Sequence, residues 1–159
     1  MSLKQWASNG WLRPHETSPK EIRDLLAIVK RDLADAAGNI SADWQFGIAY
    51  NAALKLCTVL MYASGYRPEK TLQHYRTLQA LPLILGPERK ADADYLDACR
   101  IKRNTVEYDY AGAATRKDAQ ELIEFTRELR EAVIAWLERE HVELTLPEDK
   151  PPGTANKRE

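Results

Sequence analysis

The stretch that decides the fold lies at residues 41–65 and reads SADWQFGIAYNAALKLCTVLMYASG. Ser41 is a typical helix N-cap, because its side-chain oxygen accepts a hydrogen bond from a free backbone N–H of the first turn. Apolar residues then recur at helical spacing along one face: Phe46, Ala49, Ala53, Leu56 and Leu60. Gly65 tolerates positive φ and stops the pattern. The stretch therefore predicts a long helix from Ser41 to about Ser64, with one face in the core.

A helix is also predicted just before this one. Ser18-Pro19-Lys20-Glu21 combines an N-cap serine, a proline at the first helical position and a glutamate that completes a capping box. The apolar residues that follow at helical spacing are Ile22, Leu25, Leu26, Val29 and Leu33. Gly38-Asn39 ends this helix. Residues 1–17 carry Trp6 and Trp11, and we expect an N-terminal arm that packs both tryptophans on the body.

Three further helices are predicted downstream. The first spans about residues 69–81 and is bounded by Pro82. A short apolar link at 83–87 leads to the next helix, which runs from about residue 88 to 110. The last helix starts at a weaker capping box, Thr115–Asp118, and ends near His141. The residues expected to face the core are Leu72, Tyr75 and Leu78 in the first of these helices, and Ala119, Leu122, Thr126, Leu129, Val133, Trp136 and Leu137 in the last.

These patterns predict an all-α fold, an up-and-down bundle of about five helices over residues 18–144. No segment has a convincing strand pattern. Residues 145–159 contain two adjacent prolines and a glycine, a composition that predicts a disordered tail.

The composition limits the classes of function. Net charge is −1, with 44% hydrophobic and 30% charged residues. A generic polyanion binder is therefore excluded, and any nucleic-acid contact must come from a local cluster. Cys57 and Cys99 lie in apolar helical patterns without C-x-x-C spacing, which is typical of two buried thiols in a reduced compartment. There is no signal peptide at the N-terminus, and no apolar run approaches the 18 or so residues of a membrane span. We therefore expect a cytoplasmic protein without membrane contact.

The helix at 88–110 carries an unusual polar arc. At about 100° per residue, its core-facing stripe consists of Tyr95, Leu96, Cys99 and Val106. Arg103 falls on the edge of that stripe and should be partly buried, so its guanidinium needs a partner. The residues that continue round the helix are Arg100, Asn104, Glu107 and Tyr108. This arc is a solvated face with ordinary i,i+4 pairs, an interface or a functional site.

The same helix carries a family resemblance. Arg103-Asn104-Thr105-Val106-Glu107-Tyr108-Asp109-Tyr110 resembles the R-N-x-x-x-H-x-Y signature of HEPN domains, the higher eukaryotes and prokaryotes nucleotide-binding family. The order and spacing of four other segments also resemble small stand-alone bacterial HEPN proteins, so that the likeness covers about Trp6 to Leu137. These segments are Ala49-Tyr50-Asn51-Ala52-Ala53-Leu54, Gly65-Tyr66-Arg67-Pro68, His74-Tyr75-Arg76 and the run from Leu96 to Asn104.

The resemblance implies a bundle of four or five helices that pairs as a homodimer, with the motifs of both protomers at the interface. Active members are metal-independent ribonucleases whose arginine and histidine act at the phosphate. On this chain Arg103 takes the arginine position and Asn104 the neighbouring polar position. Tyr108 stands where the histidine is expected, and a tyrosine with a pKa near 10 is a poor base at neutral pH. The resemblance therefore implies weak, altered or absent cleavage. Tyr110 corresponds to a tyrosine that is modified in some members.

His74, next to Tyr75 and Arg76, is the best candidate to replace the missing histidine, although an exposed or capping histidine is the more common case. Arg100, Lys102, Arg76 and His74 are the candidate nucleic-acid-binding residues, with Arg67 as a further member of the basic patch. No spacing of acidic residues and histidines indicates a metal site, and no glycine-rich loop indicates a phosphate cofactor.

Three hypotheses follow. The first is a toxin-like or defence-related protein acting on RNA or a nucleotide through a dimer-interface site around Arg103. The second is a catalytically inactive binding module, such as the partner of a nucleotidyltransferase or an antitoxin-type component. The third makes the polar arc a dimer interface alone.

Overall fold

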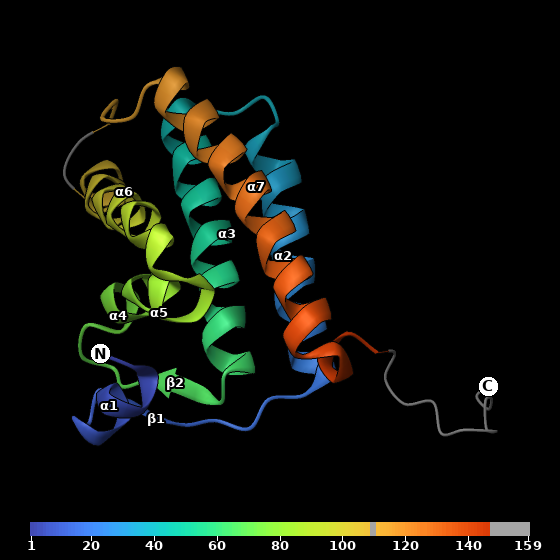
Figure 1. Cartoon of the computed structure of the whole chain (residues 1–159). Helices are drawn as coiled ribbons and strands as arrows, with labels where there is room; N and C mark the ends of the chain where they lie inside the picture. Colours follow the sequence, from blue (N-terminus) through green and yellow to red (C-terminus); the bar gives the residue numbers. More distant parts are fainter. Residues whose placement is uncertain (109–110, 147–159) are drawn as a thin grey trace.

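The computed structural model describes residues 1–108 and 111–146, apart from the side chains of Glu107 and Tyr108. It is mostly helical, as predicted (Figure 1). The elements are α1 (Leu3–Ser8), β1 (Leu12–Pro14), α2 (Pro19–Ala36), α3 (Ala42–Ala63), β2 (Tyr66–Pro68), α4 (Gln73–Gln79), α5 (Leu81–Leu85), η1 (Pro87–Arg89), α6 (Lys90–Tyr108), α7 (Arg116–Glu140) and η2 (Val142–Thr145).

The central element is α3. In Figure 1, α2 and α7 lie along one side of α3, while α6 and the short helices α4 and α5 lie on the other. Every residue predicted for the core face of α3 is at most 2% exposed. Small residues, among them Ala49, Ala52 and Ala53, let neighbouring helices approach closely, and all three are fully buried.

Three of the predicted helix starts are confirmed, those of α2, α3 and α7. The hydroxyls of Ser18 and Ser41 accept from backbone N–H groups at 3.1 and 3.2 Å. At the start of α7, Thr115 and Asp118 form the reciprocal capping box, with both bonds at 3.0 Å. The whole predicted stripe of α7 is buried.

The region between α3 and α6 differs from the prediction. Residues 66–68 form a strand that pairs antiparallel with β1, so the absence of strands was a wrong prediction. Because Leu72 adopts positive φ (57°), α4 begins only at Gln73. Leu72 and Tyr75 are therefore 56% and 39% exposed, and of the three residues predicted to face inward only Leu78 is buried. The predicted link contains α5, because Pro82 fits the first turn of a helix.

The N-terminal segment and the residues that follow α7 are also described in part. Trp6 is buried and Trp11 partly buried, with their ring centroids 5.9 Å apart. This confirms that the N-terminal segment packs its tryptophans on the body. At the other end, η2 buries Leu144, and the predicted tail beyond residue 146 lies outside the described residues.

Among the described residues, one helix is long and apolar enough to cross a membrane by length and composition alone. Polar residues interrupt its apolar ones, so a search for uninterrupted apolar runs does not find it. It is α3, but 67% of its most apolar window is buried inside the bundle. That burial is typical of the core helix of a soluble protein.

The loop between α6 and α7 is tied to the start of α3. The Asp43 carboxylate accepts hydrogen bonds from the backbone N–H groups of Gly112 (2.6 Å) and Ala114 (3.2 Å). Arg116 donates to the Ile40 carbonyl (2.6 Å) and to the Gln45 side chain (2.7 Å). These bonds hold the loop that follows α6, the helix that carries the motif.

We predict that Asp43→Ala lowers the free energy of unfolding by about 1–3 kcal/mol, because two backbone donors lose a charged acceptor. The matched control is Asp24→Ala, which removes an exposed carboxylate that pairs with Lys20. It should cost about 0.5 kcal/mol or less. Urea unfolding of both variants measures the difference, and equal losses would show that Asp43 does not hold the loop.

Candidate anion-binding site

Arg103 is partly buried on α6, as predicted. Its Cζ lies 5.4 Å from the ring centroid of Tyr50 on α3, within the range of a cation–π contact. A guanidinium keeps its charge in such surroundings, since its pKa is above 12. The Tyr50 ring therefore forms one wall of the environment that holds this charge between α3 and α6.

Tyr50 is completely buried, yet its hydroxyl makes no hydrogen bond within the described part of the chain. Burial raises the pKa of this phenol, although the charges of Arg103 and Arg100 lower it in part. The group is thus a neutral O–H at physiological pH. An unsatisfied buried hydroxyl carries a desolvation penalty. Sequence reasoning assigned Tyr50 no role of its own. The available signal was a tyrosine hydroxyl close to the small residues Ala49, Ala52 and Ala53 of the same helix.

His74 lies near the start of α4 and is half-buried. It lines a cleft of about 200 Å³ between α3 and α4, and Lys55 lines the same cleft. Burial lowers the pKa of His74, and the positive charges of Arg103, Lys55 and Arg100 lower it further. The fold thus brings His74 into the electrostatic field of Arg103. A histidine that replaced the one missing at Tyr108 would have to lie in this field.

Arg100 lies one turn before Arg103 and also faces α4. Its Nε donates to Asp97 at 2.8 Å, and its Cζ is 6.0 Å from the ring centroid of Tyr75. The positive charges of Arg103, Arg100 and Lys55 therefore act on His74, and Arg100 itself is paired with Asp97. Glu107 follows Arg103 by one turn, but its side chain lies outside the described part. The geometry favours an anion as ligand.

Two of the other predicted site residues contact groups outside the site. Lys102 points away from the site, because its Nζ donates to the Ala113 carbonyl and to Asp118, both at 3.3 Å. Its assignment to the same patch was wrong, since consecutive positions on a helix face different directions. Arg76 stacks on Trp11 instead, with Cζ 4.3 Å from the ring centroid.

Asn104 is partly exposed on α6, next to Arg103. The side chain of Tyr108 and the whole of Tyr110 lie outside the described residues. Arg67 is exposed on β2, opposite Arg13 of β1. The predicted basic patch is therefore smaller than expected on α6, and it gains Lys55 from α3.

Neither thiol nor metal chemistry has a site in the described residues. Cys57 and Cys99 are free and buried, and burial raises their pKa values to about 12 and about 11. Thiols with such pKa values are poor nucleophiles at neutral pH. Within residues 1–108 and 111–146, no three acidic, histidine or cysteine residues gather in a possible metal-binding group.

Comparisons with models of known protein families, with curated proteins and with solved structures find no match to this chain. The residues themselves are thus the evidence for what the site does. A guanidinium held against a buried ring, close to an imidazole with a lowered pKa, suits an anionic oxygen ligand. Phosphate is the common biological anion with this geometry.

The lowered pKa of His74 predicts a specific pH dependence of stability. The unfolded chain takes up a proton at this histidine near pH 6.5, whereas the folded chain does so only at lower pH. The free energy of unfolding should therefore fall as the pH drops through 6.5, with no contribution from His74 above that value. His74→Gln removes this contribution, so the variant should gain stability relative to the wild type between pH 7.5 and 5.

Urea unfolding at several pH values measures the effect. Lys55→Met provides the second arm, because losing one neighbouring cation should shrink the pH-dependent difference. Parallel pH profiles for wild type and His74→Gln would contradict the electrostatic picture of the site.

Proposed function

We propose that this chain is a HEPN-like protein that acts on RNA, or on a nucleotide, through a phosphate held at Arg103. His74 provides the imidazole that the motif lacks at Tyr108. The observation that carries the proposal is the placement of His74 in the field of Arg103 and Arg100, with Arg103 held against the ring of the buried Tyr50. The residues involved come from α3, α4 and α6, which the chain folding brings together.

Each group has a defined task in the proposed cleavage. Arg103 and Arg100 donate to the non-bridging phosphate oxygens and stabilise the negative charge of the transition state. Neutral His74 accepts the proton of the ribose 2′-hydroxyl, whose oxygen attacks phosphorus. The bond from phosphorus to the 5′-oxygen breaks, which leaves a 2′,3′-cyclic phosphate and a 5′-hydroxyl. Tyr108, at the motif histidine position, is the candidate donor of the proton to that leaving oxygen.

The lowered pKa of His74 supports its role as the base. An imidazole acts as a base only in its neutral form, and this site keeps it neutral to lower pH than usual. A bound phosphate would offset the three neighbouring cations and raise the pKa of His74. Its proton affinity would thus increase when substrate binds, as general-base catalysis requires.

The proposal extends to assembly and location. We expect a cytoplasmic homodimer in which the sites around Arg103 of both copies approach one another, in a toxin-like or defence-related system. Small nucleotides or RNA are the expected ligands.

One observation favours a second function, a catalytically inactive module that binds RNA or a nucleotide without cleaving it. Tyr108 replaces the motif histidine, and a phenol is a weak base at neutral pH. In that case the site around Arg103 binds the phosphate alone. A nucleotidyltransferase or a toxin protein would be the expected partner.

The test is cleavage of a fluorescently labelled single-stranded RNA in EDTA. We expect Arg103→Ala and His74→Gln each to lower the single-turnover rate by about 100-fold or more. Arg127→Ala, a substitution of an exposed arginine on α7, is the matched control and should leave the rate unchanged. Tyr108→His should raise the rate if the wild type is a weakened nuclease.

Other results separate the hypotheses. RNA binding that needs Arg103, without cleavage by wild type or Tyr108→His, would favour the inactive module. Sedimentation could instead show that Arg103→Ala dissociates a dimer while no RNA is bound or cleaved. That result would make the surface an interface alone and would overturn the proposal.

A further inference from the structure

A second cleft lies next to the anion site, on the other side of Tyr75. Its volume is about 680 Å³, and it lies where the N-terminal segment meets α4, α5 and the start of α6. Its wall is rich in aromatic and basic side chains, which are Trp6, Trp11, Tyr75, Arg76 and Lys90. No acidic residue is among the described residues that line it.

Flat groups are stacked on one another in this cleft. Trp6 meets Trp11 edge to face, and the Arg76 guanidinium covers Trp11 with Cζ 4.3 Å from the ring centroid. Arg76 also donates to the Thr71 carbonyl at 3.5 Å. A guanidinium fixed over an indole offers its outer face as a platform, and nucleobases stack on such planes as they do on aromatic rings.

Tyr75 joins this cleft to the anion site. It lines the cleft, and its ring centroid lies 6.0 Å from Cζ of Arg100. His74 precedes it on α4 and lies in the electrostatic field of Arg103 and Arg100. Tyr75 is therefore the residue that links this cleft to Arg100.

Exposure supports a ligand role for Tyr75. Its predicted place was the core, but it is 39% exposed because α4 starts at Gln73. A tyrosine that only filled space between helices would be covered on all sides. Here an aromatic face remains available beside two arginines.

We propose that this cleft binds an unstacked nucleobase of single-stranded RNA whose neighbouring phosphate is held by Arg100 and Arg103. This inference rests on the proposed function and adds a substrate class to it. A base within a duplex has both faces covered by its neighbours, so it cannot enter such a cleft. The Gln79 side chain, which also lines the cleft, offers an amide that can read the edge of the base.

The experiment compares two probes with the same phosphates. One is a fluorescein-labelled hexa-adenylate with 2′-O-methyl groups, which cannot be cleaved, and the other is its fully abasic counterpart. Fluorescence polarisation at fixed salt gives both affinities. The wild type should bind the base-containing probe about tenfold more tightly, as one stacked base provides. Double-stranded RNA of the same length should bind no better than the abasic probe.

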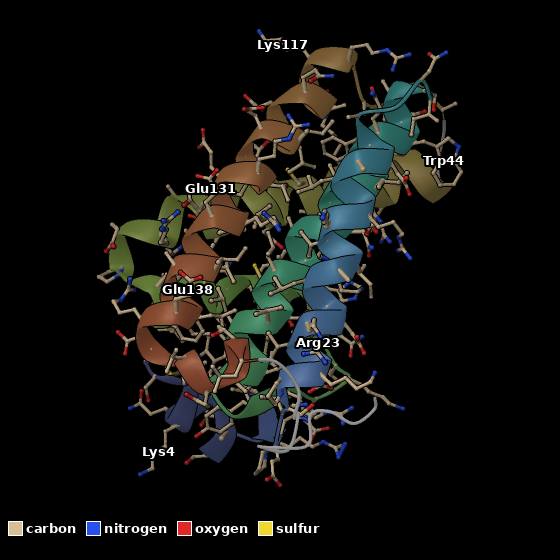
Figure 2. All side chains as sticks on the ribbon, turned by 90° about the vertical axis from the view of Figure 1, so that its right-hand side faces the viewer. Lys4, Arg23, Trp44, Lys117, Glu131 and Glu138 are labelled. Atoms are coloured by element: carbon tan, nitrogen blue, oxygen red, sulfur yellow. The ribbon has the colours of Figure 1, made fainter. Side chains whose placement is uncertain are left out.

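Variants of Tyr75 and Arg76 test whether the cleft causes the difference in affinity between the two probes. Tyr75→Leu and Arg76→Lys should each weaken binding of the hexa-adenylate about tenfold and leave the abasic probe unchanged, while Tyr75→Phe should retain affinity. The matched control is Trp44→Leu. Trp44 is 63% exposed at the far end of the bundle, opposite the end marked by Lys4 of α1 (Figure 2), and its substitution should change neither affinity.

The results distinguish a failure of the proposed base site from a failure of the proposed function. Equal affinity for both probes, with Arg103→Ala weakening both, would overturn the base site and leave the proposed function intact. If Arg103→Ala affects neither probe, the proposed function fails. If neither probe binds the wild type, both proposals are overturned.

Discussion

The burial of α3 is the constraint on which the rest of the structure depends. The helix is covered by α2 and α7 on one side and by α4, α5 and α6 on the other. Close packing around it needs small side chains, and fully buried alanines provide them. A helix covered in this way has little tolerance for a polar group, so the buried Tyr50 needs an explanation.

The candidate site explains it. Tyr50 lies against Arg103, and the phenol remains neutral because burial opposes its ionisation. On the same side, α4 brings His74 towards Arg103, Arg100 and Lys55, and its burial together with their charges lowers the pKa of the imidazole. A bound anion would interact favourably with these cations. The same groups that perturb His74 would thus hold a phosphate, which links the electrostatics of the fold to the proposed chemistry.

Much of the fold could be predicted from local signals. The serine caps, the Thr115–Asp118 capping box and the apolar stripes of α2, α3 and α7 act within a few residues, so the sequence reveals them. The wrong predictions concern features that depend on contacts between residues far apart in the sequence. The pairing of β2 with β1 and the positive φ of Leu72 expose Tyr75, and neither has a local signature. For the site, helical periodicity placed Arg103 correctly at the core edge. The approach of His74 and Lys55 required the tertiary fold.

The most direct test of the central claim is the titration of the three histidine side chains by long-range ¹H–¹⁵N NMR, with and without inorganic phosphate. The account predicts that phosphate shifts the signals of His74 and raises its pKa, because the bound anion offsets the charges of Arg103, Arg100 and Lys55. The signals of His15 and His141 should not respond, and Arg103→Ala should abolish the response of His74. A His74 titration unchanged by phosphate, or the same response in Arg103→Ala, would contradict an anion site at this position.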